Sequence, residues 1–119
     1  MKTVIFIDKQ RRIWAMDEGL GYAMLESFEG NMGSEIIGDT DYAVIYDESE
    51  VLKIGNHRIV PGDCLIMKSY YGFKGLDIDD VEKVREAFKK HTVKYEVGPF
   101  AVTGYELSDG GNKKWLMRK

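Results

Sequence analysis

Short apolar runs separated by polar turns dominate the hydrophobic pattern of this chain. Thr3–Ile7 is β-branched and apolar on both pleat faces, which is typical of a strand covered on two sides, so we expect it in the centre of a sheet. Ile13–Met16 is a second short strand or the approach to a helix. Further strands are expected at Glu35–Ile37 (a small edge strand), Tyr42–Tyr46, Val51–Ile54, His57–Val60, Cys64–Met67, Val93–Val97, Phe100–Leu107 and Lys114–Met117.

Three polar links predict how these strands are joined. Asp47–Glu50 separates two β runs by four polar residues and is expected to form a hairpin loop. Pro61–Asp63 predicts a turn, because proline presets φ and glycine accepts a positive φ. Asp109–Asn112 predicts the last hairpin turn. The middle of the chain is therefore expected to form a meander of three or four strands.

Two stretches have helical periodicity. Leu20, Met24 and Phe28 form an apolar stripe that ends at Gly30. Residues 78–91 give the better-formed helix, since Asp77 is a candidate N-cap and basic residues close the last turn. Its buried face is expected to comprise Ile78, Val81, Val84 and Phe88. The pattern predicts an α+β fold: one compact domain over residues 1–119, with a mostly antiparallel sheet of about five to seven strands and two helices packed on it.

Composition agrees with a folded globule. Of the 119 residues, 44% are hydrophobic and 31% are charged, which suits a single core and excludes a disordered chain. The one cysteine, Cys64, cannot form an internal disulfide, and Thr3–Ile7 is too short for a signal peptide or a membrane span. We therefore expect a cytoplasmic protein without membrane association.

The near-neutral net charge of −3 conceals an asymmetry along the chain. Ile13–Leu52 contains no lysine or arginine but ten carboxylates. Such a stretch can attract a basic partner, although helix and turn surfaces also need charges and the bias in sign can arise by chance. The carboxylates expected to bind a partner lie in the polar turns: Asp39, Asp41, Asp47, Glu48 and Glu50.

Motifs for catalysis, metals and cofactors are missing from the pattern, and none is predicted. Cys64 lies in an apolar run typical of a buried thiol, and two histidines with one cysteine make no zinc pattern. Asp77–Asp80 is better explained by helix capping than by a calcium loop. Direct nucleic-acid binding is not expected, because basic residues next to tryptophan occur only at Arg11–Trp14 and Lys113–Trp115 in an acidic chain.

The loop Tyr70–Gly75 offers a second candidate surface. Its two glycines predict a turn, in which three closely spaced aromatic rings cannot all be buried. Tyr70, Tyr71 and Phe73 are therefore candidate contact residues, because tyrosine provides amphipathic contact area at low entropic cost. The alternative is that two of the rings cap the core beside the following helix.

The order of elements resembles a family of small proteins from bacteriophages and conjugative elements, domain of unknown function 3846. The pieces that carry the resemblance are Lys2–Asp8, Leu20–Gly30, Tyr42–Lys53, Gly62–Met67 and Leu76–Asp80 with its helix, so it covers about residues 1–91. The family has no established activity or catalytic residues. The resemblance implies a mobile genetic element as the setting, and hence the cytoplasm of a bacterial host.

The leading functional hypothesis is a non-catalytic accessory protein of a mobile element that binds a host protein through its acidic surface. An anti-defence inhibitor, of the anti-CRISPR or anti-restriction kind, would compete with nucleic acid for a basic groove in this way. The alternative is a module that binds a protein or a small ligand through the Tyr70–Gly75 loop. A metal-dependent enzyme using Asp39 and Asp41 is the third and least favoured hypothesis.

Overall fold

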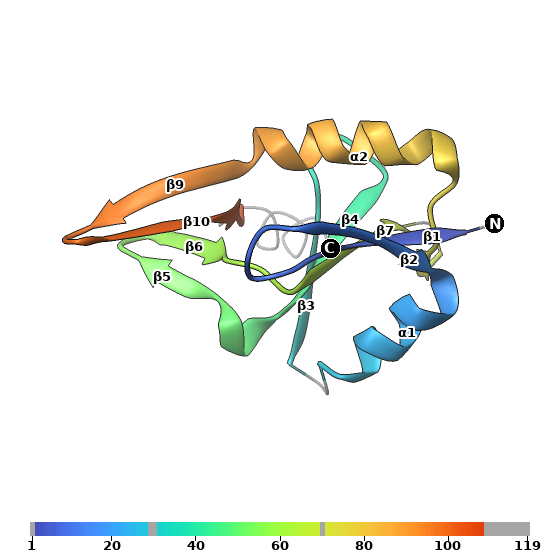
Figure 1. The fold of residues 1–119 in the computed structure, drawn as a ribbon, viewed down its shortest axis with the longest axis horizontal. Helices are drawn as coiled ribbons and strands as arrows, with labels where there is room; N and C mark the ends of the chain where they lie inside the picture. The colour runs from blue at the N-terminus through green and yellow to red at the C-terminus, as the bar shows by residue number, and fades with distance from the viewer. Residues whose placement is uncertain (1, 29–30, 70, 109–119) are drawn as a thin grey trace, which may run out of the picture.

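The computed structural model describes residues 2–28, 31–69 and 71–108 (Figure 1). Within them the chain forms an α+β fold, as predicted. The helices are α1 (Glu18–Glu26), the short 3-10 helix η1 (Glu48–Glu50) and α2 (Ile78–Lys90). The strands are β1 (Thr3–Ile7), β2 (Ile13–Asp17), β3 (Met32–Ile36), β4 (Tyr42–Asp47), β5 (Leu52–Ile54), β6 (His57–Val60), β7 (Cys64–Ser69), β8 (Phe73–Lys74), β9 (Thr92–Val97) and β10 (Phe100–Glu106).

Six strands form the main sheet, which we call the body sheet. Its order is β2-β1-β7-β4-β3, and the short β8 pairs with the end of β7. All of these pairings are antiparallel. The prediction that Thr3–Ile7 lies inside a sheet is confirmed, since β1 has β2 on one side and β7 on the other. The β2 segment is a strand rather than the start of a helix, and β3 is an edge strand, as predicted.

The two helices cover opposite faces of the body sheet (Figure 1). On the α1 face, a buried cluster unites β1, β4 and β7 with Phe28, which follows the helix. On the α2 face, a larger cluster includes Val84 and Phe88 from the helix. Strands β4 and β7 are almost fully buried because they are covered on both faces.

The apolar stripe predicted for α1 is confirmed at Met24 and Phe28, which contact the core, but not at Leu20. Leu20 is 54% exposed, whereas Gly21 is buried. A Cβ atom at Gly21 would lie only 2.6 Å from Cγ2 of Val4, so the missing side chain lets the helix approach β1 closely. The predicted placement of Leu20 on the buried face was wrong.

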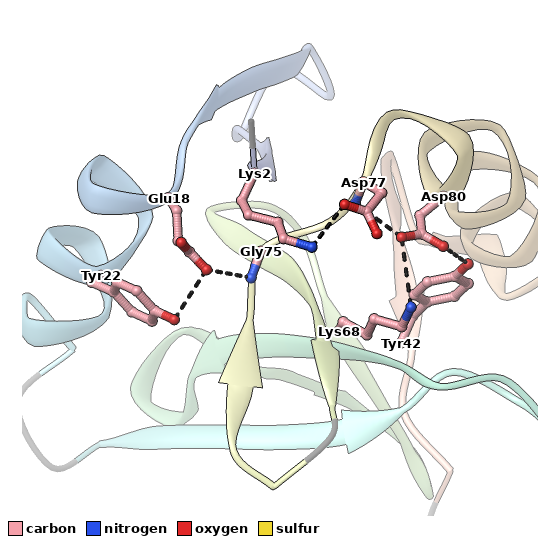
Figure 2. A network of polar contacts seen from close by, with 8 residues as sticks. All are labelled: Lys2, Glu18, Tyr22, Tyr42, Lys68, Gly75, Asp77 and Asp80. Atoms are coloured by element: carbon pink, nitrogen blue, oxygen red, sulfur yellow. Dashed lines mark hydrogen bonds and ion pairs between the residues drawn. The ribbon is translucent and has the colours of Figure 1, made fainter.

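α2 starts at the predicted cap, and polar contacts fix this end to the sheet (Figure 2). The backbone N–H of Asp77 donates to the Asp80 carboxylate, which also accepts a hydrogen bond of 2.7 Å from the Tyr42 hydroxyl. Lys68 lies 3.8 Å from the same buried carboxylate. The prediction for Ile78 was wrong: it is 84% exposed, because it lies in the first turn, beyond the part of α2 that packs on the sheet.

A second sheet of four strands was not predicted as a separate layer. Its order is β5-β6-β10-β9, and it projects from the body as a wing (Figure 1). Most of β10 pairs only with β9, while its last residues, Tyr105 and Glu106, pair with β6. We call this sheet the wing.

The wing also corrects the hairpin predicted at Asp47–Glu50. β4 belongs to the body sheet and β5 to the wing, so the strands on either side of this segment do not pair. The segment forms η1 and leads from one sheet to the other. The expected meander is therefore limited to the β5–β6 hairpin. The strand expected at Lys114–Met117 and the turn at Asp109–Asn112 lie outside the described residues.

Candidate partner-binding site

The five acidic candidates fall into two groups at opposite ends of β4. Asp39 and Asp41, which we call the acidic pair, lie in the turn before this strand, whereas Asp47, Glu48 and Glu50 lie in and beside η1 after it. A six-residue strand is roughly 20 Å long. The acidic stretch therefore does not form one continuous surface from these residues.

The group at η1 is engaged within the molecule. Asp47 accepts hydrogen bonds inside the turn that it begins. Both carboxylate oxygens of Glu48 accept from Nη2 of Arg58 at 2.6 Å, and Glu50 lies 3.0 Å from Nζ of Lys9. These ion pairs neutralise much of the charge that the sequence presents here, so this end of β4 is a weaker attractor for a basic partner than its carboxylates suggest.

Other carboxylates of the acidic stretch also have structural partners. Asp17 caps α1, and Glu18 accepts a hydrogen bond of 2.7 Å from the backbone N–H of Gly75 (Figure 2). Glu35 accepts from the backbone N–H of Ser108. Several of the ten carboxylates thus hold the fold together.

The acidic pair is different, because both residues are exposed and their side chains have no hydrogen bond or ion pair with any described residue. The turn that carries them is tight: Gly38 has a φ of +55°, and the hydroxyl of Thr40 donates to the carbonyl of Ile37. The pair is thus held on a well-defined turn with its charge available to solvent.

The fold brings the acidic pair next to the aromatic loop. The backbone N–H of Ser69 donates to the carbonyl of Asp41 at 2.7 Å, where β7 leads into the loop. Two residues later Tyr71 is 89% exposed and has a φ of +53°. Residues from two distant parts of the sequence thus lie side by side at one end of the body sheet.

The remaining aromatic candidates differ from Tyr71. Phe73 is half-buried and packs against the core cluster on the α1 face, so its ring belongs to the core. Tyr70 lies outside the described residues. Lys74 is exposed on β8 and pairs across the hairpin with Lys68. The candidate site is therefore Asp39, Asp41 and Tyr71, with a positive charge on the far side of the hairpin.

Sequence reasoning missed a polar cluster in the wing. The carboxylate of Glu106 contacts Nδ1 of His57 at 2.6 Å and accepts from the hydroxyl of Tyr95 at 2.9 Å. Burial opposes ionisation of Glu106, but the hydrogen bonds from His57 and Tyr95 outweigh it and lower the pKa of the carboxyl. Both carboxylate oxygens of Glu106 thus take part in joining β6, β9 and β10. The three residues are far apart in the sequence, so no sequence pattern predicts that they meet.

Both histidines border one hollow of about 440 Å³ between the wing and the end of α2. The ring of His91 packs near that of Tyr105, and His57 is held by Glu106. No side chain in this hollow is placed as an activated nucleophile by any contact among the described residues. The hollow thus carries no catalytic arrangement of the kind in which a base orients a nucleophile.

Cys64 is fully buried, and burial raises the pKa of its thiol to about 12. Such a thiol is not a nucleophile at neutral pH. Among residues 2–28, 31–69 and 71–108, no three His, Cys, Asp or Glu side chains are grouped so that they could hold a metal ion. In the same residues, neither helix has the length and apolar character needed to cross a membrane.

Comparison with known proteins adds no relative: no protein-family model, no curated protein and no solved structure matches the chain. The resemblance to domain of unknown function 3846 is neither supported nor contradicted by this result, and function has to be argued from the geometry of the molecule itself.

Proposed function

We propose that this chain is a non-catalytic binding protein that engages a basic surface of a protein partner through Asp39, Asp41 and Tyr71. The observation that carries the proposal is that the turn with two unneutralised carboxylates is joined, through the Ser69–Asp41 hydrogen bond, to the strand that leads into the exposed Tyr71. Carboxylates steer a basic partner and set its orientation, while a tyrosine buried on binding supplies contact energy.

The backbone at Tyr71 supports a role outside the fold. A positive φ costs a non-glycine residue roughly 1–2 kcal/mol, and asparagine or glycine would fill this position more cheaply. A large ring on the surface at such a position offers little burial in return. A residue whose backbone conformation lowers the stability of the fold, and whose side chain is exposed to a partner, is typical of a binding site.

The partner that suits this surface is a nucleic-acid-binding host protein with a lysine- or arginine-rich groove, as the mobile-element hypothesis expects. The acidic surface available to it is narrower than the sequence suggests, since the carboxylates at η1 already pair with Arg58 and Lys9. The site is a small contact surface at one end of the sheet, and its two carboxylates do not form an extended row like the phosphates of a nucleic acid. We place this interaction in the bacterial cytoplasm.

The test is affinity capture from a bacterial lysate, followed by titration of the captured protein in purified form. Asp39→Asn with Asp41→Asn should weaken binding about tenfold at low salt, and the loss should shrink as salt rises. The matched control is Glu26→Gln with Glu96→Gln, which removes two exposed charges elsewhere and should change affinity less than about twofold.

Tyr71→Asn tests the aromatic part of the site. It should lower affinity by about tenfold or more, because the ring that provides contact area is removed while asparagine accepts the positive φ. A captured partner whose affinity is unchanged by both the Asp39/Asp41 double variant and Tyr71→Asn would show that the site lies elsewhere.

A further inference from the structure

β2 is an outer strand of the body sheet whose free edge carries apolar side chains. Only β1 pairs with it among the described strands. Ile13 is 52% and Trp14 48% exposed, and Ala15 is exposed as well. An edge of this kind is normally blunted by an internal lysine, a proline, a bulge or a covering loop, and β2 has no lysine, proline or bulge.

The opposite edge of the same sheet, β3, has features that prevent pairing with another strand. β3 contains Gly33, Ser34 and the charged Glu35, and the carboxylate of Glu35 holds the backbone of Ser108 beside the strand. The two edges have equal lengths but different chemistry. The β2 edge is thus the one that suits another strand.

The charges that flank β2 indicate which partner strand would pair with its free edge. Arg11 and Arg12 precede the four apolar residues, and Asp17 and Glu18 follow them. Arg12 also pairs with Asp8, and Asp17 and Glu18 have the partners in α1 and at Gly75 described above, but Arg12 keeps 64% of its side chain exposed. When two such strands run antiparallel, the basic end of each lies beside the acidic end of the other. We propose that a second copy of this chain pairs with β2 edge to edge, about a two-fold axis close to Ala15.

The surroundings of β2 permit this pairing. α1 and α2 cover the two faces of the sheet, and no described residue pairs with the outer edge of β2 between them (Figure 1). Between β2 and α2 lies a groove of about 500 Å³, whose apolar floor includes Ile5, Ile7 and Ile13. A two-fold axis perpendicular to the sheet places both α2 helices on the same face, so the two grooves, each with an apolar floor and with charged side chains of α2 along its side, meet above the paired strands.

A charge-exchange experiment at position 15 tests the pairing. Sedimentation velocity of the unmodified chain should show a monomer–dimer equilibrium that shifts to dimer as concentration rises. Ala15→Lys and Ala15→Glu should each be monomeric at every concentration, since like charges then face each other across the axis within roughly 8 Å. An equimolar mixture of the two variants should restore the dimer, because the charges are now opposite.

Ala101→Lys is the matched control, as Ala101 is also an exposed alanine on a strand, in the wing. It should dimerise like the unmodified chain. Dimerisation in the mixture also shows that both variants fold. The proposal is overturned if the unmodified chain stays monomeric at high concentration, if Ala15→Lys alone still dimerises, or if the mixture does not.

Discussion

The body sheet and the wing are stabilised by different means within one short chain. In the body, β4 and β7 are buried on both faces, and the apolar clusters under α1 and α2 supply most of the buried surface. In the wing, β9 and the first half of β10 are largely exposed, Val60 and Tyr105 join the core cluster under α2, and the polar cluster at Glu106 links the strands farther out. Burial therefore sets the stability of the body, whereas a few specific contacts fix the shape of the wing.

A close backbone approach marks the place where β10 meets β6. β10 passes from β9 to β6 at Gly104, whose missing side chain allows the strands to meet. A Cβ atom there would lie 2.3 Å from the carbonyl oxygen of Val60. At Gly21 in the body, by contrast, the nearest neighbour of an added Cβ atom would be the side chain of Val4 rather than backbone.

The largest expected effect is the difference between equivalent valine truncations in the two regions. Val44 is fully buried in β4, and Val102 is half-buried in β10. Val44→Ala should lower the free energy of unfolding by about 2 kcal/mol or more, and Val102→Ala by less than about 1 kcal/mol. Urea denaturation followed by circular dichroism measures both. Equal losses would show that the wing has an apolar core of its own.

Gly104→Ala should come next in size. The added methyl collides with backbone and cannot be relieved by a side-chain rotation, so a loss of about 1–3 kcal/mol is expected. The damage should be local: hydrogen exchange should accelerate at Leu107, whose N–H donates to the carbonyl of Arg58, but not in β1. Thr103→Ala, at an exposed neighbouring position, is the control and should leave exchange at Leu107 unchanged.

The smallest effect is a difference in acid sensitivity. Hydrogen bonding from Trp14 holds the pKa of Asp8 in the body at about 2, and hydrogen bonds from His57 and Tyr95 hold the pKa of Glu106 in the wing below its usual value. A carboxyl with a lowered pKa stabilises the fold fully above its unfolded value and loses this contribution as the pH falls through its folded value. Acidification should therefore perturb the wing once the pH falls below the usual pKa of a glutamate, while the Asp8 contacts persist to about pH 2.

NMR amide shifts recorded between pH 7 and pH 2 measure this order. Glu106→Gln should remove the transition at β6, β9 and β10 and leave the one near Asp8 in place. Simultaneous loss of both regions in the unmodified chain would contradict independent stabilisation of body and wing.

Local sequence signals predicted the elements that are determined by local physics. α2 was recognisable because its cap at Asp77, its charged ends and its buried Val84 and Phe88 all follow from helix geometry. Thr3–Ile7 was recognisable as a strand covered on both faces. α1 was predicted only in part: Met24 and Phe28 of its apolar stripe do contact the core, but an apolar period cannot reveal the close approach at Gly21, where the side chain is absent.

Pairings between distant segments could not be predicted. Nothing local shows that β4 has both edges occupied by β3 and β7, which leaves β5 to join another sheet. The candidate site has the same origin. The sequence indicated both the carboxylates and the aromatic loop, but only the Ser69–Asp41 hydrogen bond shows that one acidic group lies beside the loop and the other does not.

The strand order also determines when the chain can fold. β1 forms a local hairpin with β2, but its second neighbour is β7, where Ile5 pairs with Ile66. During synthesis, this apolar strand must therefore wait for its second partner until Ile66 and its neighbours in β7 have left the ribosome. Pairings this distant slow folding, so the nascent N-terminal hairpin is the segment that we expect chaperones to shield.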